Sequence, residues 1–259
     1  MMRLRFLGTG TSSGVPQLRC GCPTCISTDA HDRRLRCSAF VECADGTNLL
    51  IDCGPDFYVQ MLHMPRAIDI DALLVTHQHY DHVGGIDDLR PYCWKNEHFP
   101  VYCQADVERD LRQRIPYAFS ENPYPGVPHF EFRRVEPFRA FNIGGVEIVP
   151  VPVNHYRLEI VGYRIGRSLA YITDAKFVPD ATVEALKGID TLVINALRLK
   201  EHVSHMSLEQ SLEVISRIGP RRAFLTHISH DMPPVHEAAR LLPANVSFAY
   251  DGLEIDIYD

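Results

Sequence analysis

The chain has 259 residues, and its 33 acidic side chains outnumber the 26 basic ones, which gives a formal charge of −7. A composition of 46% hydrophobic and 23% charged residues excludes a disordered chain, a collagen-like fibre and a small disulfide scaffold. The acidic balance, without a long basic run, argues against an extended nucleic-acid partner but leaves room for a local phosphate pocket.

No apolar stretch reaches the ~18–20 residues that a membrane span needs, so we expect no membrane partner. The N-terminal segment lacks the apolar core of a signal peptide, which leads us to expect a cytoplasmic protein. Thiols stay reduced there, so the eight cysteines are expected to be core residues, metal ligands or nucleophiles. Without internal repeats, residues 1–259 are expected to form a single domain.

Short apolar runs predict strands along the whole chain. They cover residues 3–7, 39–43, 49–52, 72–76, 146–153, 160–165, 169–173, 191–194, 223–226 and 253–257. Helical patterns are fewer and cover residues 105–114, 180–186, 207–218 and 234–241. In the third of these, Gln210 follows Ser207 at the spacing of a capping box. Because strands outnumber helices, we expect an α/β protein with two packed sheets and flanking helices.

The segment from residue 77 to residue 82 carries the strongest chemical signal. A buried-strand pattern runs into His77, His79, Asp81 and His82, four candidate ligands within six residues. In an extended chain His77 and His79 point to the same side and can bind one ion through neutral imidazoles. Asp81 and His82 follow where the chain turns, and they can face a second ion. The alternative, polar residues on an exposed turn, does not explain four such residues directly after an apolar strand.

Three further candidate ligands stand where later strands end. His155, Asp174 and His227 each follow an apolar run. Each alone can be a capping or turn residue, but the recurrence favours ligands that complete two coordination spheres. Imidazole and carboxylate together suit zinc, manganese or iron.

The order and spacing of these residues resemble the metal motifs of the metallo-β-lactamase superfamily: His77-x-His79-x-Asp81-His82, then His155, Asp174 and His227. The resemblance implies a four-layer αββα sandwich. It assigns His77, His79 and His155 to one ion and Asp81, His82 and His227 to the other, with Asp174 bridging both. It also implies a hydroxide held between the ions as the nucleophile, since metal binding lowers the pKa of water to about 7. Asp81 is expected to be required for turnover.

A second metal site is indicated near the N-terminus, where Cys20, Cys22 and Cys25 share a loop with Gly21 and Pro23. Reduced thiolates bind zinc strongly, and three at this spacing exceed the two that a redox pair needs. Ordinary buried cysteines are the alternative. Spacing alone does not name the fourth ligand of a tetrahedral site.

Within the superfamily, the chain resembles the phosphodiesterases of the bacterial carbon–phosphorus lyase pathway, which hydrolyse phosphoribosyl cyclic phosphate. The matching segments are residues 7–16, the C-x-C-x-x-C loop, residues 36–38 and residues 225–230. The resemblance implies that His230 completes the structural zinc site. A role for His230 beside the catalytic centre is the alternative, and Cys37 is a rival ligand that we expect in the core instead.

The same resemblance places His205 against the reacting group, where an imidazole can stabilise charge or protonate the leaving oxygen. His202 is the alternative for that role. The small-residue loop of residues 9–14 either offers N–H groups to a phosphate or forms a simple tight turn.

These motifs together predict a phosphodiesterase with two catalytic Mn or Zn ions and one structural Zn, acting on a small cyclic or nucleotide-like phosphate ester. A thioester or lactone hydrolase is an alternative, because one metal core serves several chemistries on one fold. A 3′-tRNA processing endonuclease is disfavoured by the acidic charge and by the lack of a basic, glycine-rich arm. A non-catalytic metal-binding module is disfavoured by the complete ligand set. A homodimer is the default assembly.

Overall fold

Two seven-stranded sheets carry the fold in the computed structural model, which describes residues 1–94 and 98–258. The first has the order β14-β1-β2-β3-β4-β5-β6, formed by Glu254–Ile257, Met2–Gly8, Ser38–Glu42, Asn48–Ile51, Ala72–Leu74, Phe99–Cys103 and Phe130–Arg134. The second has the order β13-β12-β11-β10-β9-β8-β7, formed by Val246–Phe248, Arg222–Thr226, Thr191–Asn195, Leu169–Tyr171, Leu158–Ile165, Val146–His155 and Phe141–Ile143.

Alternating side chains give each sheet two apolar faces. In β3, Leu49 and Ile51 belong to the core between the sheets, whereas Leu50 belongs to the core under the outer helices. The second sheet contributes Tyr163 to the core between the sheets, where its hydroxyl donates to the Val75 carbonyl at 2.7 Å. The sheets therefore pack face to face through one shared apolar core.

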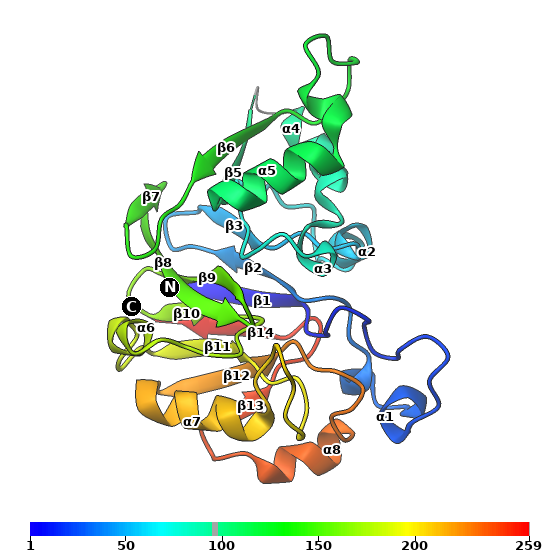
Figure 1. Cartoon of the computed structure of the whole chain (residues 1–259), viewed down its shortest axis with the longest axis vertical. Coiled ribbons are helices and arrows are strands. Elements are labelled where there is room, and N and C mark those ends of the chain that lie inside the picture. Colours follow the sequence, from blue (N-terminus) through cyan, green and yellow to red (C-terminus); the bar gives the residue numbers. More distant parts are fainter. Residues whose placement is uncertain (95–97, 259) are drawn as a thin grey trace.

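Helices cover the outer face of each sheet and complete four layers (Figure 1). On the first sheet lie α2 (Phe57–Leu62), α3 (Tyr80–Val83), α4 (Arg90–Cys93) and α5 (Ala105–Arg114). On the second lie α6 (Asp180–Ala185), α7 (Leu208–Ile218) and α8 (Val235–Ala238). The cysteine loop contains α1 (Pro23–Ile26). Short 3-10 helices occupy Ala30–Asp32, Ile86–Leu89, Pro116–Phe119 and Ala239–Leu241. The αββα sandwich is confirmed.

Each predicted strand overlaps an observed one, but two end two residues earlier than predicted. The strand predicted over 72–76 ends at Leu74, and the one over 169–173 ends at Tyr171, because the chain there turns toward polar groups of the candidate site. The predicted capping box is present at the start of α7: Ser207 Oγ accepts from Gln210 N at 3.3 Å, and Ser207 N donates to Gln210 Oε1 at 3.1 Å.

Other elements differ from the sequence prediction. Strands β5, β6, β7 and β13 were not predicted. In β6, β7 and β13 polar outward residues interrupt the apolar runs, and β5 contains Pro100. The helix predicted over 234–241 is divided into α8 and a 3-10 turn. Cys93, one of the cysteines expected to be core residues, metal ligands or nucleophiles, is buried at the end of the short helix α4. None of the helices in the described ranges has the length and apolar character needed to cross a bilayer.

Polar residues that follow parallel strands of both sheets meet at the site. In the first sheet β3 and β4 run parallel, and in the second β10, β11 and β12 do. Asp52 follows β3, Asp174 comes after β10, and His227 follows β12. All three have left-handed backbones, with φ of 58°, 57° and 55°. Such a conformation costs roughly 1–2 kcal/mol in a non-glycine residue, and clusters of it mark functional sites.

Candidate metal centre

Three histidines converge into one ligand group. His77 follows β4 and is fully buried, His79 precedes α3 on the exposed side, and His155 ends β8. His77 Nε2 lies 3.0 Å from His79 Nδ1, and candidate ligand atoms of the three residues lie within 4.8 Å of one another. Nitrogens bound to one tetrahedral ion at about 2.0 Å stand about 3.3 Å apart, so this spacing fits a metal site.

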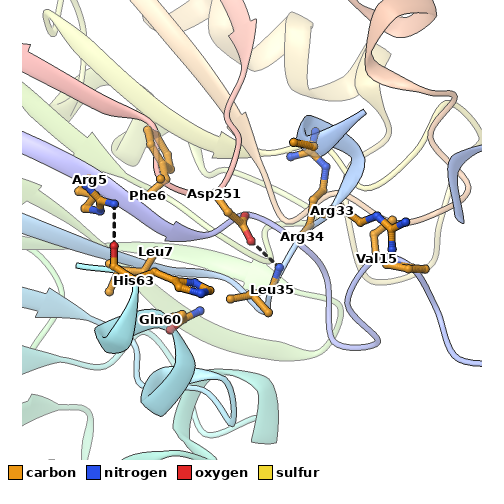
Figure 2. A pocket seen from close by; sticks show the side chains of 13 residues that line it. Arg5, Phe6, Leu7, Val15, Arg33, Arg34, Leu35, Gln60, His63 and Asp251 are labelled. Carbon is orange, nitrogen blue, oxygen red and sulfur yellow. Dashed lines mark hydrogen bonds between the residues drawn. The ribbon is translucent and has the colours of Figure 1, made fainter. Parts of the chain in front are cut away.

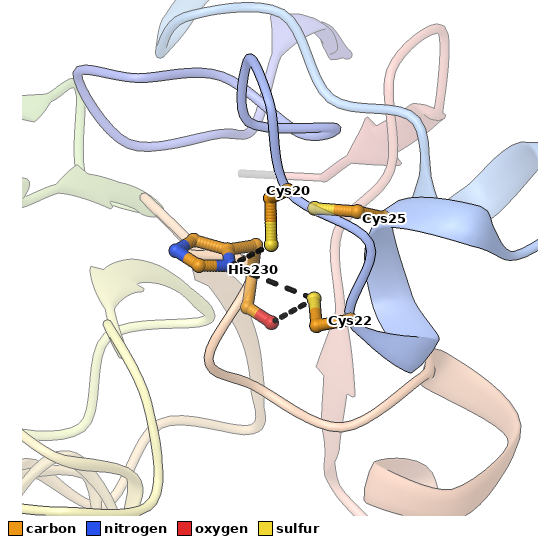
Figure 3. A group of neighbouring side chains, drawn as sticks. All are labelled: Cys20, Cys22, Cys25 and His230. Carbon is orange, nitrogen blue, oxygen red and sulfur yellow. Dashed lines mark hydrogen bonds between the residues drawn. The ribbon is translucent and has the colours of Figure 1, made fainter.

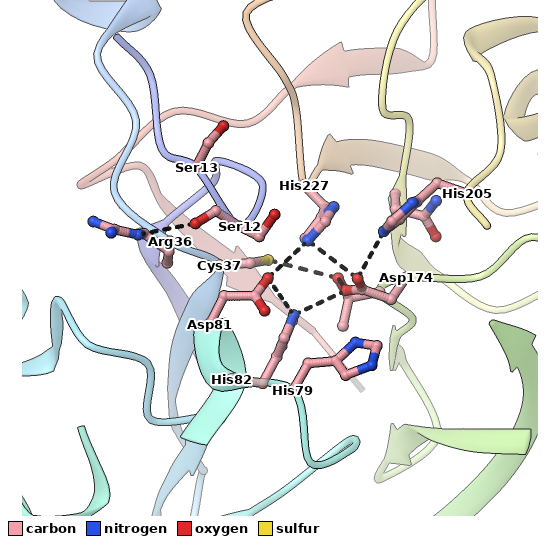
Figure 4. Close-up of polar contacts among 12 residues, drawn as sticks. Ser12, Ser13, Arg36, Cys37, His79, Asp81, His82, Asp174, His205 and His227 are labelled. Atoms are coloured by element: carbon pink, nitrogen blue, oxygen red, sulfur yellow. Dashed lines mark hydrogen bonds and ion pairs between the residues drawn. The ribbon is translucent and has the colours of Figure 1, made fainter. Parts of the chain in front are cut away.

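Four buried residues form the adjacent group: Asp81, His82, Asp174 and His227. His82 Nε2 lies 3.2 Å from Asp81 Oδ2 and 3.1 Å from Asp174 Oδ2. His227 Nε2 lies 3.4 Å from Asp81 Oδ2 and 3.1 Å from Asp174 Oδ1. Figure 4 shows these side chains pointing toward one another from opposite sheets. The structure thus brings the members of each predicted ligand set together, and Asp174 lies beside both sets.

The electrostatics of the two groups differ. Burial and the nearby charge of His82 lower the pKa of His77 well below its usual value, which keeps its imidazole neutral. Burial alone would raise the pKa of the Asp174 carboxyl, but His227 and His82 hold it well below its usual range. Neutral imidazoles and ionised carboxylates are the protonation states that bind divalent metals, so His77 and Asp174 suit an ion. Burial lowers the pKa of His82, but Asp174, Asp81 and Asp52 raise it well above its usual value, so His82 would release a proton when an ion binds.

Asp52, which the sequence interpretation did not assign to the site, orients His82. Its Oδ2 accepts from His82 Nδ1 at 2.7 Å and from Thr76 Oγ1 at 2.8 Å, and its Oδ1 accepts from Thr76 N at 2.8 Å. This leaves the lone pair of His82 Nε2 for a metal. That buried nitrogen has no hydrogen-bond partner of acceptable geometry among the described residues. The only sequence signal for Asp52 was its position at a strand end.

His155 is oriented in the same way, through a bond from Nδ1 to the Ser204 carbonyl at 2.8 Å. His205 lies beside it, with Nε2 at 2.9 Å from Asp174 Oδ1. His205 Nδ1 lies 3.2 Å from His202 Nδ1, on the outer side of the group. The structure therefore places His205 against Asp174 and His202 one step further out.

The cysteine loop forms a separate cluster with His230 (Figure 3). His230 Nδ1 lies 3.3 Å from Cys20 Sγ and 3.5 Å from Cys22 Sγ, and Cys25 Sγ completes the group of four. Burial raises the pKa of the Cys22 thiol, but the hydrogen bond with His230 and further bonds lower it to about 7. Three thiols and an imidazole fit a tetrahedral zinc. Cys37 lies elsewhere in the core, 3.1 Å from the Tyr171 hydroxyl.

The small-residue loop of residues 9–14 folds into a turn at the edge of the group formed by Asp81, His82, Asp174 and His227. Gly14 N donates to the Thr11 carbonyl at 2.8 Å, which leaves Ser12 and Ser13 exposed at the tip. Arg36 donates from Nε to the Ser12 carbonyl at 3.3 Å, and Figure 4 shows all three residues beside Asp81 and His227. Arg90, Arg164 and Arg198 form ion pairs with Asp87, Glu147 and Asp231.

Comparison with known proteins identifies the family. Residues 47–228 match the family model described as the beta-lactamase superfamily domain. The crystal structure of a diphosphatase from the PhnP family is 40% identical, with a TM-score of 0.90, and the match covers 99% of this chain and 98% of that one. The chain belongs to the β-lactamase superfamily and, within it, to the PhnP family.

Two other relatives match nearly the whole chain. An octanoyltransferase of Porphyromonas gingivalis is 43% identical over 255 residues, which cover 98% of this chain and 51% of that protein. This PhnP-family chain thus spans about half the length of that relative. The Zn²⁺-bound PqqB of Methylobacterium extorquens shares the fold, with a TM-score of 0.84 at 20% identity and coverage of 98% and 99%.

Proposed function

We propose that the chain is a dinuclear metal-dependent phosphodiesterase that acts on a small cyclic or nucleotide-like phosphate ester. The position of Asp174 carries the proposal. Its Oδ2 lies 3.1 Å from His82 Nε2 of one ligand group, and candidate ligand atoms of Asp174 and of His155, which belongs to the other group, lie within 4.8 Å of each other, so one carboxylate stands between the two groups. The similarity to a PhnP-family diphosphatase supports phosphoryl chemistry at this site.

The donor set fits two divalent ions, Mn or Zn, each held by imidazoles and carboxylate. One ion is assigned to His77, His79 and His155, the other to Asp81, His82 and His227, with Asp174 shared. Bound ions supply Lewis acidity toward phosphoryl oxygens and lower the pKa of water to about 7. Asp52 and the Ser204 carbonyl keep the ligating nitrogens of His82 and His155 aimed inward.

His205 is proposed to hold the proton that the leaving oxygen takes up. Its Nε2 bonds to Asp174 Oδ1 at 2.9 Å, and its Nδ1 lies 2.9 Å from Ser204 Oγ. Burial lowers the pKa of His205, and the bond to Asp174 opposes that effect. A positioned imidazole of this kind contributes about 10²–10⁴-fold to proton transfer.

The test is hydrolysis of bis(p-nitrophenyl) phosphate and of a cyclic-nucleotide panel by protein loaded with Mn or Zn. We expect turnover that EDTA abolishes and that Asp81→Ala reduces at least 100-fold with the fold retained. His205→Ala is expected to lose about 10²–10⁴-fold in kcat while metal content stays unchanged. A metal-loaded protein that is inert to every phosphodiester in the panel contradicts the proposal.

A thioester hydrolase is a second candidate, favoured by one observation. The relative that is 43% identical over 98% of this chain is named an octanoyltransferase, although the chain spans only half of that protein. Hydrolysis of octanoyl-coenzyme A without phosphodiester activity would decide for this candidate.

We further propose a structural zinc on Cys20, Cys22, Cys25 and His230, a cytoplasmic location and a homodimer. Cys20, Cys22 and Cys25 form no disulfide, which suits a reducing compartment. Metal analysis of protein without the catalytic ions should find one zinc per chain. Light scattering should give the mass of a dimer.

A further inference from the structure

A cavity of about 520 Å³ lies next to the metal centre but shares no lining residue with it among the described residues. The end of β1, the segment of residues 30–35, helix α2 and residues 251–252 enclose it (Figure 2). Leu35 lines this cavity, whereas the next residue, Arg36, extends to the Ser12 turn at the metal centre. The extended segment around Leu35 therefore separates two distinct spaces.

The wall of the cavity carries a buried cation. Arg34 is 5% exposed and donates through Nη1 to Thr9 Oγ1 at 2.8 Å and to the Ala249 carbonyl at 2.6 Å. In the described part of the chain no carboxylate oxygen lies within 4.0 Å of its guanidinium. Burial lowers the pKa of Arg34 to about 10, and the nearby charges of Asp251, Asp32 and Asp29 oppose that shift.

The single carboxylate on the described part of the wall, Asp251, offsets part of the Arg34 charge. The hydrogen bonds of the Asp251 carboxylate come from neutral donors: it accepts from Thr9 Oγ1 at 2.7 Å and from Leu35 N at 2.6 Å. Arg33 is exposed, and Arg5 pairs with Glu254. Three arginines and one carboxylate thus face the cavity, and this balance favours an anion.

A buried acceptor opposes the cationic side. Gln60, on α2, is 2% exposed and donates from Nε2 to the Arg36 carbonyl at 2.8 Å. Its Oε1 is buried and has no hydrogen-bond partner among the described residues. Buried acceptors in proteins normally have a donor, so this oxygen calls for an N–H or O–H group from a ligand. The remaining wall is apolar, formed by Phe6, Leu7, Val15, Pro16 and Leu35.

We infer that this cavity binds a nucleoside monophosphate, with the phosphate at Arg33 and Arg34 and an N–H group of the base at Gln60 Oε1. The apolar wall contacts the base and sugar. The volume lies within the 300–1,000 Å³ of small-molecule sites. This site is separate from the metal centre, so the inference does not depend on the proposed phosphodiesterase activity.

The experiment is calorimetric titration of the full, metal-loaded chain with adenosine 5′-monophosphate, adenosine and inorganic phosphate. We expect one saturable site for the nucleotide, with adenosine and phosphate each bound at least tenfold more weakly. Arg33→Gln, at an exposed position, should weaken nucleotide binding at least tenfold, and Gln60→Met should weaken it as well. Arg167→Gln removes the same charge from an exposed arginine outside the cavity and should leave binding unchanged.

Asp81→Ala separates this inference from the proposed function, because it disables the metal centre but should leave nucleotide binding intact. No nucleotide binding up to about 1 mM, the range of weak ligands, overturns the inference. It is also overturned if binding is lost in Asp81→Ala and unaffected by Arg33→Gln, since the nucleotide then occupies the metal centre. If inorganic phosphate binds as tightly as the nucleotide, the base makes no contribution, and this result contradicts a ligand with both a phosphate and a base.

Discussion

At the scale of single residues, Asp52 shows how a side chain without a ligand role controls a metal site. It accepts three hydrogen bonds, two from Thr76 and one from His82 Nδ1. Only an ionised carboxylate accepts all three, because an amide turns one acceptor into a donor. The histidine ring is therefore held in the tautomer and orientation that a metal requires.

We expect Asp52→Asn to weaken metal binding at the catalytic centre about 10–100-fold, the usual effect of removing such a partner. Competition with a chromogenic chelator measures this directly and does not rely on activity. Asp87→Asn, which breaks a surface pair with Arg90, is the matched control and should bind metal normally. Unchanged affinity in Asp52→Asn would show that His82 is oriented by other contacts.

Asp251 makes stability depend on pH. Burial raises its pKa from 3.8 to about 6 in the folded chain. At a pH between these two values, the folded state therefore holds a proton that the unfolded state has released. Its contribution to stability is therefore present at low pH and is lost as the pH rises through 6.

Because asparagine cannot titrate, Asp251→Asn should gain stability relative to the parent chain between pH 5 and pH 7.5. The two pKa values predict a relative gain on the order of 1–2 kcal/mol. Urea unfolding at both pH values, with metals held at saturation, measures the difference. A pH-independent difference between the two proteins would mean that Asp251 titrates normally.

At the scale of elements, the cysteine loop depends on a contact far along the chain. Cys20 and Cys22 lie within 3.5 Å of His230 Nδ1, so the N-terminal loop is held against the segment that follows β12. Thr24 strengthens this contact by donating from Oγ1 to the Met232 carbonyl at 2.6 Å. A zinc there would connect two segments that have little apolar surface of their own.

We expect Cys22→Ser to lose one zinc per chain and roughly 3 kcal/mol of unfolding free energy, and to speed proteolysis within the loop. Metal analysis combined with urea unfolding and limited proteolysis tests this. Cys93→Ser changes a buried thiol in α4, outside the cluster, and should keep its zinc. A full zinc content in Cys22→Ser would remove that thiol from the site.

At the scale of the whole molecule, the catalytic ligands come from both sheets. His77, His79, Asp81 and His82 follow β4 of the first sheet, whereas His155, Asp174 and His227 belong to β8 or follow β10 and β12 of the second. Ions bound between them would connect the sheets in addition to the shared apolar core. Without ions, Asp81 and Asp174 are buried carboxylates balanced only by neighbouring histidines.

Removal of the ions with EDTA should therefore lower the urea midpoint of the entire chain, and Mn or Zn should restore it. A ligand present at 1,000 times its Kd stabilises the folded state by about 4 kcal/mol. Asp174→Ala, which lacks the shared ligand, should show a much smaller response to added metal. A midpoint that EDTA leaves unmoved would indicate that the centre does not link the sheets.

The residue types and spacings in the sequence were enough to predict the sheets and the metal site of this protein. Short apolar runs such as 49–52 predicted strands, and the cluster at residues 77–82 predicted a metal site, because both signals arise from neighbours in the sequence. Strands β6, β7 and β13 gave weaker signals, since their exposed positions carry polar side chains.

The tertiary structure alone decided which distant groups meet. The bond from His82 to Asp52, the contact of His205 with Asp174, and the cavity between Gln60 and Arg34 join residues far apart in sequence. No spacing rule predicts them, because they depend on how two sheets pack and where their polar ends coincide. Burial likewise set the pKa values of Arg34 and Asp251, since desolvation depends on the packed surroundings and not on residue type.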